Sequence, residues 1–283
     1  MTARTRSART APAQRRALGC ARSSLLAGGL AALLAGCGGG ALPPAPAAET
    51  AAPAPVGQAD RVDLTGLPTA STFGDLADAV ADPAPQAATD GVVLRIERDV
   101  AVHRSPGGPA FARLPATQLG NPTWVPLIAR HGDWAQILLP SRPNNSSGWI
   151  RVGPADPVTQ ARTPYHVDVD VDAKRLVVRE SGRDIGTWTV GVGSTDAPTP
   201  RGRTYLMAAI EETVTKFSPI ILPLGTHSET FNSYGGGPGT VALHGWPDPA
   251  VFGEEASDGC VRVPPDALRL LSTLPLGTVV SLH

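Results

Sequence analysis

Hydrophobic and polar positions alternate along the second half of the chain in the pattern of β-strands. Apolar and polar residues alternate strictly from Tyr165 to Val171, which is typical of a strand with one wet face, and His166 falls on that wet face. A turn at Asp172–Lys174 and the segments Arg175–Glu180 and Ile185–Val192 extend this strand into an antiparallel meander. Further short strands are predicted at Thr204–Ala209, Thr240–Leu243, Val261–Val263 and Thr278–Leu282. We therefore expect a mainly β fold here.

Three segments of this half depart from the strand pattern. A short helix is predicted to begin at Pro264–Ala267, because Pro and Asp are favoured in a first helical turn. Phe217–Leu224 is apolar, but its two prolines predict an edge strand or an irregular segment. Thr226–Gly239 is rich in glycine, which gives no local rigidity, so it is either a lid over a site or a plain surface loop. His227 in this segment is expected to be solvated.

The first half predicts a separate small all-β unit over residues 91–153, divided by turn clusters rich in Gly, Pro and Ser. The runs Gly132-Asp133-Trp134 and Gly148-Trp149-Ile150 resemble bacterial SH3-like domains, in which such tryptophans pack inside a small barrel. Core packing is the expectation for Trp124 as well, and an exposed aromatic groove for wall peptide or glycan is the alternative. The strands are expected at Val92–Ile96, Val100–His103, Thr123–Ala129, Trp134–Leu139 and Gly148–Val152.

The N-terminal residues carry the pattern of an exported, membrane-attached protein. Arginines precede an apolar run from Ser23 to Ala35, which is too short for a membrane span of about 20 residues and fits an export signal over residues 1–36. The run Leu34-Ala35-Gly36-Cys37 resembles a bacterial lipobox, which implies cleavage before Cys37 and a diacylglyceryl group on its sulfur. Residues 37–90 are then an Ala/Pro-rich tether from the outer face of the cell membrane, with a short helix near Thr72–Val80.

Charge and composition argue against several classes of partner. Without residues 1–36 the chain keeps 18 Lys+Arg against 25 Asp+Glu, and this net charge of −7 argues against a nucleic-acid partner. Membrane attachment then depends on the lipid at Cys37, because no polybasic patch is present. The sequence contains neither a nucleotide-binding loop nor His and Cys at metal-ligand spacing, so we expect no cofactor and no metal.

One cysteine remains in the exported part of the chain once Cys20 has left with the signal and Cys37 carries lipid. This residue, Cys260, has no partner for an internal disulfide, and glycines and charged residues flank it rather than an apolar run. His244 lies sixteen positions earlier. A thiol and an imidazole are the minimum for a cysteine nucleophile, because the imidazole activates the thiol and carries its proton. The two residues are therefore the candidate catalytic pair.

The residues around this pair resemble a known family. His244-Gly245 is followed by Ser257-Asp258-Gly259-Cys260-Val261-Arg262, and this order is similar to the L,D-transpeptidase catalytic domain (YkuD-type) of bacterial cell-wall enzymes. The resemblance covers roughly residues 163–283 and implies a β-sandwich or barrel with a short C-terminal helix. Asp258 departs from the family, which often has histidine there. A carboxylate beside the thiol disfavours the thiolate, unless Asp258 points away or binds a substrate amine.

The resemblance implies a two-step acyl transfer on peptidoglycan, with stem tetrapeptides as donor and acceptor. The Cys260 thiolate attacks the L-to-D bond after the third stem residue, D-Ala leaves, and an amine of a second stem converts the acyl-enzyme into a 3→3 crosslink. His244 acts as base and then as acid. Backbone N–H groups of Gly259 and Cys260 bind the oxyanion, and a backbone carbonyl near Gly245 orients the imidazole. Carbapenem-type inhibitors are expected to acylate Cys260.

The sequence leaves the roles of four further residues open. Arg262 holds either a substrate carboxylate or a structural acid, and Ser257 hydrogen-bonds either the substrate or its own turn. Tyr234 and Trp246 either line the acyl-donor groove or pack in the core.

Other functions fit the same residues. With water or a protein lysine as acceptor, the enzyme would be an L,D-carboxypeptidase or would anchor proteins to the wall. A non-catalytic wall-binding lipoprotein is the alternative of a different class, with the SH3-like unit as its binding element. If the protein is an enzyme, removal of residues 91–153 is expected to spare chemistry on small soluble substrates.

Overall fold

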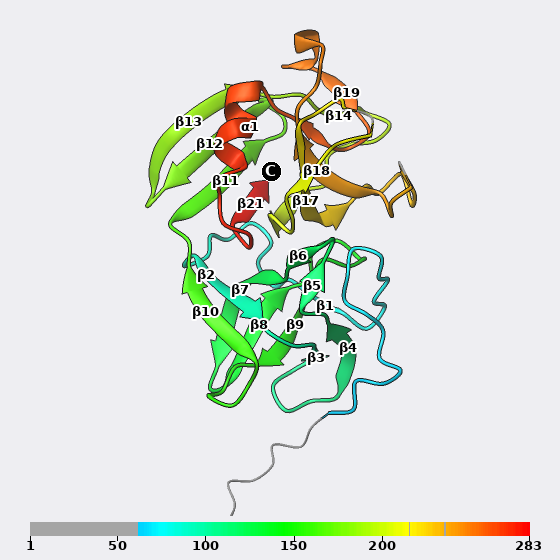
Figure 1. The fold of residues 1–283 in the computed structure, drawn as a ribbon, viewed down its shortest axis with the longest axis vertical. Helices are drawn as coiled ribbons and strands as arrows, with labels where there is room; N and C mark the ends of the chain where they lie inside the picture. Colours follow the sequence, from blue (N-terminus) through cyan, green and yellow to red (C-terminus); the bar gives the residue numbers. More distant parts are fainter. Residues whose placement is uncertain (1–61, 215, 235) are drawn as a thin grey trace, which may run out of the picture. The chain divides into compact units, whose positions relative to one another are not determined.

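The computed structural model describes residues 62–214, 216–234 and 236–283, which all belong to one compact unit. Regular structure in this part is almost entirely β, as predicted, with one short α-helix, α1 (Pro265–Leu271), and one 3-10 helix, η1 (Pro249–Val251). Figure 1 shows the strands in two groups that follow one another along the chain, β1 to β10 and then β11 to β21. The predicted signal, the lipid site at Cys37 and the first part of the predicted tether lie outside the described residues.

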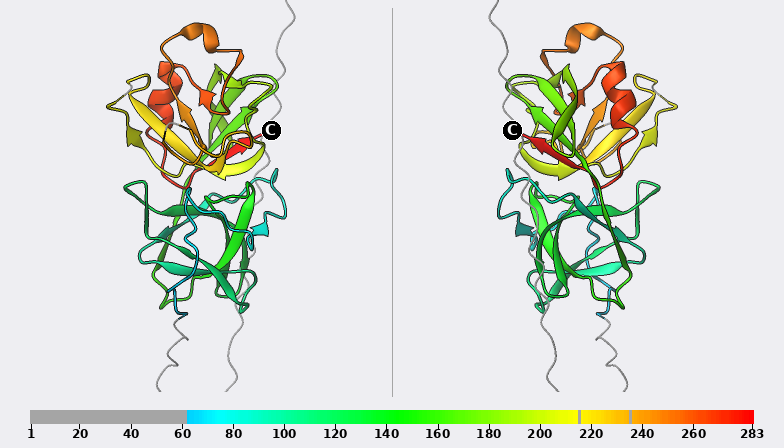
Figure 2. Two further views of the ribbon diagram at one scale, coloured as in Figure 1. Left: turned by 90° about the vertical axis from the view of Figure 1, so that its right-hand side faces the viewer. Right: turned by 90° about the vertical axis from the view of Figure 1, so that its left-hand side faces the viewer.

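The first group forms an antiparallel sheet in the order β10-β2-β7-β8-β9-β3-β4, with β1 paired to β9. Its strands curve around a common interior (Figure 2). Their bounds are β1 (Val80–Ala81), β2 (Val92–Ile96), β3 (Val100–His103), β4 (Ala110–Leu114), β7 (Trp124–His131), β8 (Trp134–Leu138), β9 (Ser146–Arg151) and β10 (Val158–Arg162), and the short β5 (Thr117–Gln118) and β6 (Asn121–Pro122) pair with each other.

The prediction was accurate for β2 and β3, and it was within two residues for β7, β8 and β9. It missed β4 and β10. The β10 residues, Val-Thr-Gln-Ala-Arg, show no apolar alternation, because the strand is held by backbone pairing to β2 along its whole length and not by a buried face. The sheet therefore continues past residue 153 to Arg162.

The three tryptophans of this group do not lie in its core, so the expectation of core packing was wrong. All three are half-buried. The residue after each one occupies the inward face of the strand instead, since neighbouring side chains point to opposite faces of a sheet. These inward residues, each 0 % exposed, are Val125, Ala135 and Ile150.

Residues 62–90 belong to the folded unit and are not the tether that the sequence predicted. They form turns, isolated bridges and β1, and the predicted helix near Thr72–Val80 is absent from this described segment. The Ala70 N–H bonds the Arg113 carbonyl at 2.8 Å, and the Leu76 N–H bonds the Arg142 carbonyl at 2.8 Å. The composition was misleading because the segment is anchored by backbone groups and by a few buried side chains.

One of these buried side chains joins the segment to the second group of strands. The Asp82 carboxylate accepts hydrogen bonds from Nε and Nη2 of Arg203 at 2.6 and 2.7 Å. Both side chains are almost fully buried. The third Arg203 nitrogen, Nη1, donates to the Ala87 carbonyl at 2.9 Å, so Arg203 holds this segment at two points.

The second group contains a five-stranded sheet in the order β13-β12-β11-β21-β15 and a four-stranded sheet in the order β16-β17-β18-β20. Both sheets and α1 contribute to one core, which includes Val167, Leu176, Leu222, Leu243 and Leu268. The bounds are β11 (Tyr165–Asp170), β12 (Arg175–Glu180), β13 (Arg183–Thr189), β14 (Val192–Gly193), β15 (Gly202–Tyr205), β16 (Ile210–Glu211), β17 (Ile220–His227), β18 (Thr240–His244), β19 (Glu255–Ser257), β20 (Val261–Arg262) and β21 (Val279–Leu282).

The apolar segment with two prolines corrects one prediction. It was expected to be irregular or at an edge, but Ile220–His227 forms β17, which lies between β16 and β18. Strand β16 covers only Ile220 and Ile221 of it. Pro223 lies beyond that short cover, where the absence of a proline N–H is tolerated.

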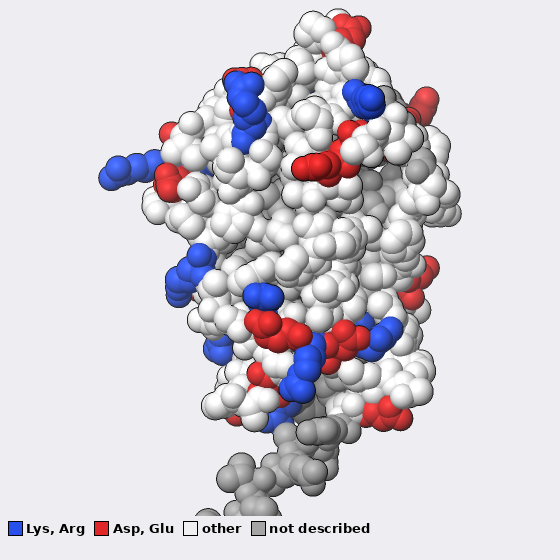
Figure 3. Space-filling view, viewed as in Figure 1, with Lys and Arg blue, Asp and Glu red and all other residues white. Residues whose placement is uncertain are grey.

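Among the described residues, no helix is long and apolar enough to cross a membrane. On the face drawn in Figure 3, acidic and basic side chains are interspersed over the first group of strands. A band of mostly uncharged residues lies above them in the same view.

Candidate active site

Two neighbouring parallel strands position the candidate catalytic pair, because His244 ends β18 and Cys260 immediately precedes β20. In the pairing of β18 with β20, Leu243 lies opposite Val261, and His244 lies opposite Arg262. Leu243 and Val261 are both 0 % exposed in the core. Because side chains alternate along a strand, His244 and Cys260 extend from the other face. Parallel strands about 4.8 Å apart, with a rise of about 3.3 Å per residue, put the two Cα atoms about 8 Å apart, so the side chains are within reach of each other.

The environment of the Cys260 sulfur favours a protonated resting thiol. Burial raises the pKa of Cys260 above its ordinary value, and the Asp258 carboxylate raises it further. A backbone hydrogen bond from Ala242 and the charge of Arg262 act in the opposite direction. The raised pKa means that the thiol carries its proton at neutral pH and needs a base when it attacks.

The His244 imidazole is oriented as that base requires. His244 is 6 % exposed, and its Nδ1 lies 2.7 Å from the Gly245 carbonyl oxygen, which accepts the hydrogen bond. The proton is thus on Nδ1, and Nε2 presents a lone pair. Burial lowers the pKa of His244, Arg262 lowers it further, and the Gly245 carbonyl raises it. The ring is therefore neutral at pH 7. The sequence predicted a backbone carbonyl here, and the carbonyl is that of Gly245.

The turn before Cys260 is held by its own hydrogen bonds. Gly259 has φ +111, a conformation that side chains disfavour. The Ser257 hydroxyl donates to the Cys260 carbonyl at 2.5 Å and accepts from the Gly259 N–H at 3.2 Å. Thr199 Oγ1 donates to the Gly259 carbonyl at 3.0 Å. Ser257 is buried, and its hydroxyl is occupied within the turn, which supports the turn-holding alternative for this residue.

The two N–H groups that sequence reasoning assigned to the oxyanion differ in their availability. The Gly259 N–H is already bonded to the Ser257 hydroxyl. Within the described part of the chain, no group accepts a hydrogen bond from the Cys260 N–H. Only the Cys260 N–H is therefore free for a developing negative charge.

Arg262 and Trp246 form one wall of the site. The Arg262 guanidinium carbon lies 3.7 Å from the centroid of the Trp246 ring, and its buried Nε has no hydrogen-bond partner. No carboxylate of the described residues forms an ion pair with Arg262, so the structural acid that the sequence allowed is not seen. Trp246 is half-buried and also lies 5.7 Å from Phe217, outside the core cluster.

Tyr234 and Asp258 lie at the mouth of the site. Tyr234 is 57 % exposed, which excludes the core-packing alternative for its side chain. Partial burial raises the pKa of Tyr234, Asp258 raises it by its charge and by a hydrogen bond, Cys260 raises it, and Arg262 lowers it. Asp258 is itself exposed, and its carboxylate acts on the Tyr234 phenol together with Cys260 and Arg262.

A cavity of about 550 Å³ is lined by Gly245 and Trp246, which follow His244 in the chain. Phe217, Gly245, Trp246 and Leu268 supply much of its apolar lining, and Glu211, Glu212 and Arg269 supply charge. His244 and Cys260 do not line this cavity, which adjoins the site through Phe217, Gly245 and Trp246 and offers both apolar and charged contacts.

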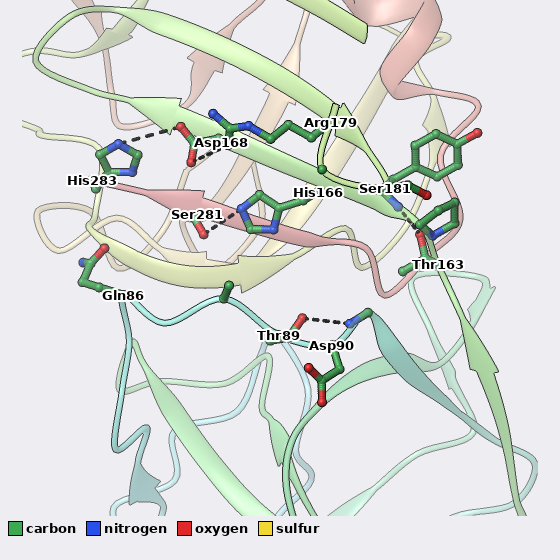
Figure 4. A pocket seen from close by; sticks show the side chains of 15 residues that line it. Gln86, Thr89, Asp90, Thr163, His166, Asp168, Arg179, Ser181, Ser281 and His283 are labelled. Carbon is green, nitrogen blue, oxygen red and sulfur yellow. Dashed lines mark hydrogen bonds and ion pairs between the residues drawn. The ribbon is translucent and has the colours of Figure 1, made fainter. Parts of the chain in front are cut away.

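A larger cavity of about 740 Å³ lies elsewhere, between residues 86–91 and the strands β11, β12 and β21. Figure 4 shows that Asp168 faces both Arg179 and His283 inside it, at 3.2 and 3.8 Å. His166 lies against the Ser281 hydroxyl at 3.2 Å. This cavity is lined neither by Cys260 or His244 nor by any residue next to them in the chain, so it is not the active-site candidate.

Sequence reasoning missed several residues that shape the site. Ser218 Oγ accepts from the Gly245 N–H at 2.8 Å and fixes the residue that orients the imidazole. Phe217 lies edge-on to His244 with ring centroids 5.0 Å apart. No local pattern marks these residues, because they precede His244 by more than twenty positions and meet it only through the pairing of β17 with β18. No group of His, Cys, Asp and Glu in the described residues is arranged to hold a metal ion.

Known proteins resemble the part of this chain that contains His244 and Cys260. Residues 164–282 match the model of the L,D-transpeptidase catalytic domain family, YkuD. The "Putative L,D-transpeptidase YkuD" of Bacillus subtilis is 30% identical over 132 residues, which is 46% of this chain and 71% of that protein. The protein of the same name from Bacillus licheniformis is 28% identical over 152 residues, or 52% of this chain and 85% of that protein.

Solved L,D-transpeptidase structures match about half of this chain. That of L,D-transpeptidase 3 from Mycobacterium tuberculosis, in complex with a faropenem-derived adduct, has a TM-score of 0.38 and 13% identity, and the match covers 50% of this chain and 74% of that one. That from Mycobacterium smegmatis has a TM-score of 0.36 and 12% identity, and covers 56% and 93%. On the family match and the Bacillus subtilis relative, this chain belongs to the YkuD-type L,D-transpeptidase family.

Proposed function

We propose that this protein forms 3→3 crosslinks in peptidoglycan through an acyl-enzyme on Cys260, with His244 as acid and base. One observation carries the proposal. The register of β18 against β20 directs His244 and Cys260 to one face of the sheet. The Gly245 carbonyl binds Nδ1 of the imidazole, which leaves the lone pair on Nε2 available to accept a proton. Membership of the transpeptidase family supports the same chemistry.

In the first step the thiol proton moves from the Cys260 sulfur to Nε2 of His244 as the sulfur attacks the carbonyl carbon of the L-to-D bond. The Cys260 N–H stabilises the oxyanion. The carbon–nitrogen bond then breaks, and the imidazolium gives its proton to the departing D-Ala amine. A thioester remains on Cys260. The raised pKa of the thiol and the lowered pKa of the imidazole make both groups neutral before the attack, so the proton moves during the reaction.

In the second step an amine of a neighbouring stem attacks the thioester carbon. His244 takes a proton from this amine, the carbon–sulfur bond breaks, and the thiolate recovers that proton. We assign Arg262 to a substrate carboxylate, because this half-buried residue has no acidic partner among the described residues and its guanidinium lies over the Trp246 ring. The 550 Å³ cavity beside Trp246 is assigned to one of the two stem peptides.

The test is mass spectrometry of the full chain and of its products. Incubation with stem tetrapeptides is expected to give crosslinked dimers that have lost one D-Ala, and tripeptide alone would instead indicate an L,D-carboxypeptidase. A carbapenem is expected to add its mass to the protein, and Cys260→Ala is expected to abolish this adduct. A persistent adduct in Cys260→Ala would contradict the assignment. Retained wall binding with no adduct in either protein would favour a non-catalytic wall-binding lipoprotein.

We further propose that the protein is a lipoprotein on the outer face of the cell membrane and reaches the cell wall. The lipobox-like run that ends at Cys37 supports this, and the interspersed surface charge offers no alternative membrane patch in the view of Figure 3. A diacylglyceryl mass on the N-terminal peptide, absent in Cys37→Ser, would test it. The likeness of residues 91–153 to SH3-like domains stays part of this proposal, and the curved antiparallel sheet of the first group supports it.

A further inference from the structure

An arginine from the first group of strands binds the glycine-rich segment that carries Tyr234. We name this segment, Ser228–Gly239, the flap. Arg142 lies between β8 and β9, and its Nη1 donates to the Ser228 carbonyl at 3.0 Å. Its Nη2 donates to the carbonyls of Phe231 and Pro238 at 3.1 and 3.0 Å. One guanidinium therefore joins both limbs of the flap.

The residues around Arg142 fix the base of the flap as well. The Asn144 side-chain amide donates to the His227 carbonyl at 2.7 Å and accepts from the His227 N–H at 2.9 Å. The His227 ring is 0 % exposed, so the expectation of a solvated histidine was wrong, and its Nε2 donates to the Thr72 carbonyl at 2.7 Å. The Ser228 N–H bonds the Gly239 carbonyl at 2.8 Å and closes the base.

The flap does not hold this shape by its own composition. Gly236 and Gly239 have φ +81 and +75, and glycine-rich segments lose much entropy when ordered. The tip is closed by a reciprocal pair of backbone bonds between Tyr234 and Gly237, at 3.0 and 2.9 Å. Thr230 Oγ1 donates to the carbonyl of Asp196, a residue between β14 and β15 of the second group of strands, at 2.9 Å. The Arg142 contacts are thus a major part of what orders the flap.

The flap begins next to the turn that holds the nucleophile, because a Cβ added at Gly259 would meet the Ser228 Cβ at 3.8 Å. The flap also carries Tyr234, whose pKa is raised by Asp258 and Cys260. We propose that Arg142 is a positioning residue of the active site, which clamps the flap so that Tyr234 is held beside the nucleophile. This inference rests on the proposed function. It makes the first group of strands a working part of the active site, and it reverses the expectation that removal of residues 91–153 spares chemistry.

The chemistry of the contact requires arginine. A guanidinium is planar and presents five N–H donors in a fixed fork, so two of its nitrogens can serve three carbonyls. A lysine ammonium keeps the positive charge but has a single nitrogen, and it cannot reach all three carbonyl oxygens in the same geometry. Arg142→Lys therefore separates the clamp from the charge.

The experiment compares Arg142→Ala and Arg142→Lys with wild type in the full chain. Arg104→Ala is the matched control, because Arg104 belongs to the same group of strands but pairs with Asp78 at an exposed position. Amide hydrogen exchange of residues 228–239 is expected to become about tenfold faster in both Arg142 variants and to stay unchanged in Arg104→Ala. The value of kcat/KM for the tetrapeptide donor is expected to fall about tenfold in the same two variants, mainly through KM.

A double-mutant cycle shows whether Arg142 acts through the flap residue. In a Tyr234→Ala background, Arg142→Ala is expected to cause little further loss of kcat/KM, because the group that it positions is gone. Additive losses, unchanged exchange in Arg142→Lys, or equal effects in Arg104→Ala would each overturn the proposal. Hydrogen exchange does not depend on turnover. If flap exchange is faster in the Arg142 variants but the wild-type protein makes no crosslinks, the proposed function is rejected, whereas the role of Arg142 in ordering the flap is retained.

Discussion

The replacement Asp82→Ala tests whether residues 62–90 belong to the folded unit. The substitution removes the two carboxylate oxygens that accept from Arg203, and one of them, Oδ1, also accepts from the Ala84 N–H at 3.0 Å. Arg203 keeps only its bond to the Ala87 carbonyl. Since its side chain is 3% exposed, the guanidinium would stay in the interior with an uncompensated charge.

The expected loss of stability is large for a single residue. Removal of one member of a buried ion pair costs about 3–5 kcal/mol, because the remaining charge has been taken out of water without a partner. For a domain of this size, such a loss lowers the melting temperature by roughly 10 °C. The exposed pair between Arg104 and Asp78, at 52% and 68% side-chain exposure, is worth about 0–1 kcal/mol. Asp78→Ala is therefore the matched control.

Urea unfolding of the two variants and of wild type, followed by tryptophan fluorescence, measures these differences. A double replacement, Asp82→Leu with Arg203→Met, is expected to recover much of the lost stability, because it removes both charges from the interior. If Asp82→Ala stays within about 1 kcal/mol of wild type, the pair is not formed in solution. Residues 62–90 would then be the loose tether that their composition suggested.

Three further predictions concern the site and the base of the flap. As pH is lowered, the rate of Cys260 acylation is expected to fall only below the ordinary histidine pKa of about 6.5, because burial lowers the pKa of His244. Arg262→Gln should move this decrease in rate to higher pH, because the charge of Arg262 also lowers the His244 pKa. An unchanged pH dependence in the variant would reject the influence of Arg262. Gly259→Ala is expected to lower the free energy of unfolding by about 1–3 kcal/mol, because residue 259 has a φ of +111, and to slow acylation. Gly253→Ala, at φ +94, is the control and should lower stability without slowing acylation. An unchanged acylation rate in Gly259→Ala would contradict this. Burial lowers the pKa of His227 to about 4, so the unfolded state binds the proton before the folded state does as pH falls. The contribution of His227 to the free energy of unfolding should therefore be full above pH 6.5 and decrease by about 3 kcal/mol toward pH 4. His227→Gln should remove that part of the pH dependence, and an identical slope in both proteins would refute it.

The sequence was informative wherever the signal is carried by neighbouring residues. Alternation predicted the meander from Tyr165 onward, and the proline-led helix was found close to its place, as α1 begins at Pro265. Prediction from the sequence failed at β10 and in residues 62–90, where hydrogen bonds between backbone groups order residues that have no apolar pattern. It also put the tryptophans in the core, since composition does not record which face of a strand a residue occupies.

For the site, the sequence by itself determined the reacting groups: one unpaired thiol, a histidine followed by glycine, and the turn of Ser257 to Arg262 that marks the family. Tertiary structure decided how these groups are tuned. The opposite positions of His244 and Arg262, the burial that lowers one pKa and raises the other, and the Arg142 contacts with the flap all depend on strand pairing. Arg142 and Phe231 are 89 positions apart, and Asp82 and Arg203 are 121 apart. Local periodicity reports only which face a residue can take. Which distant residue meets it there is settled when the sheets pair and water is excluded between them.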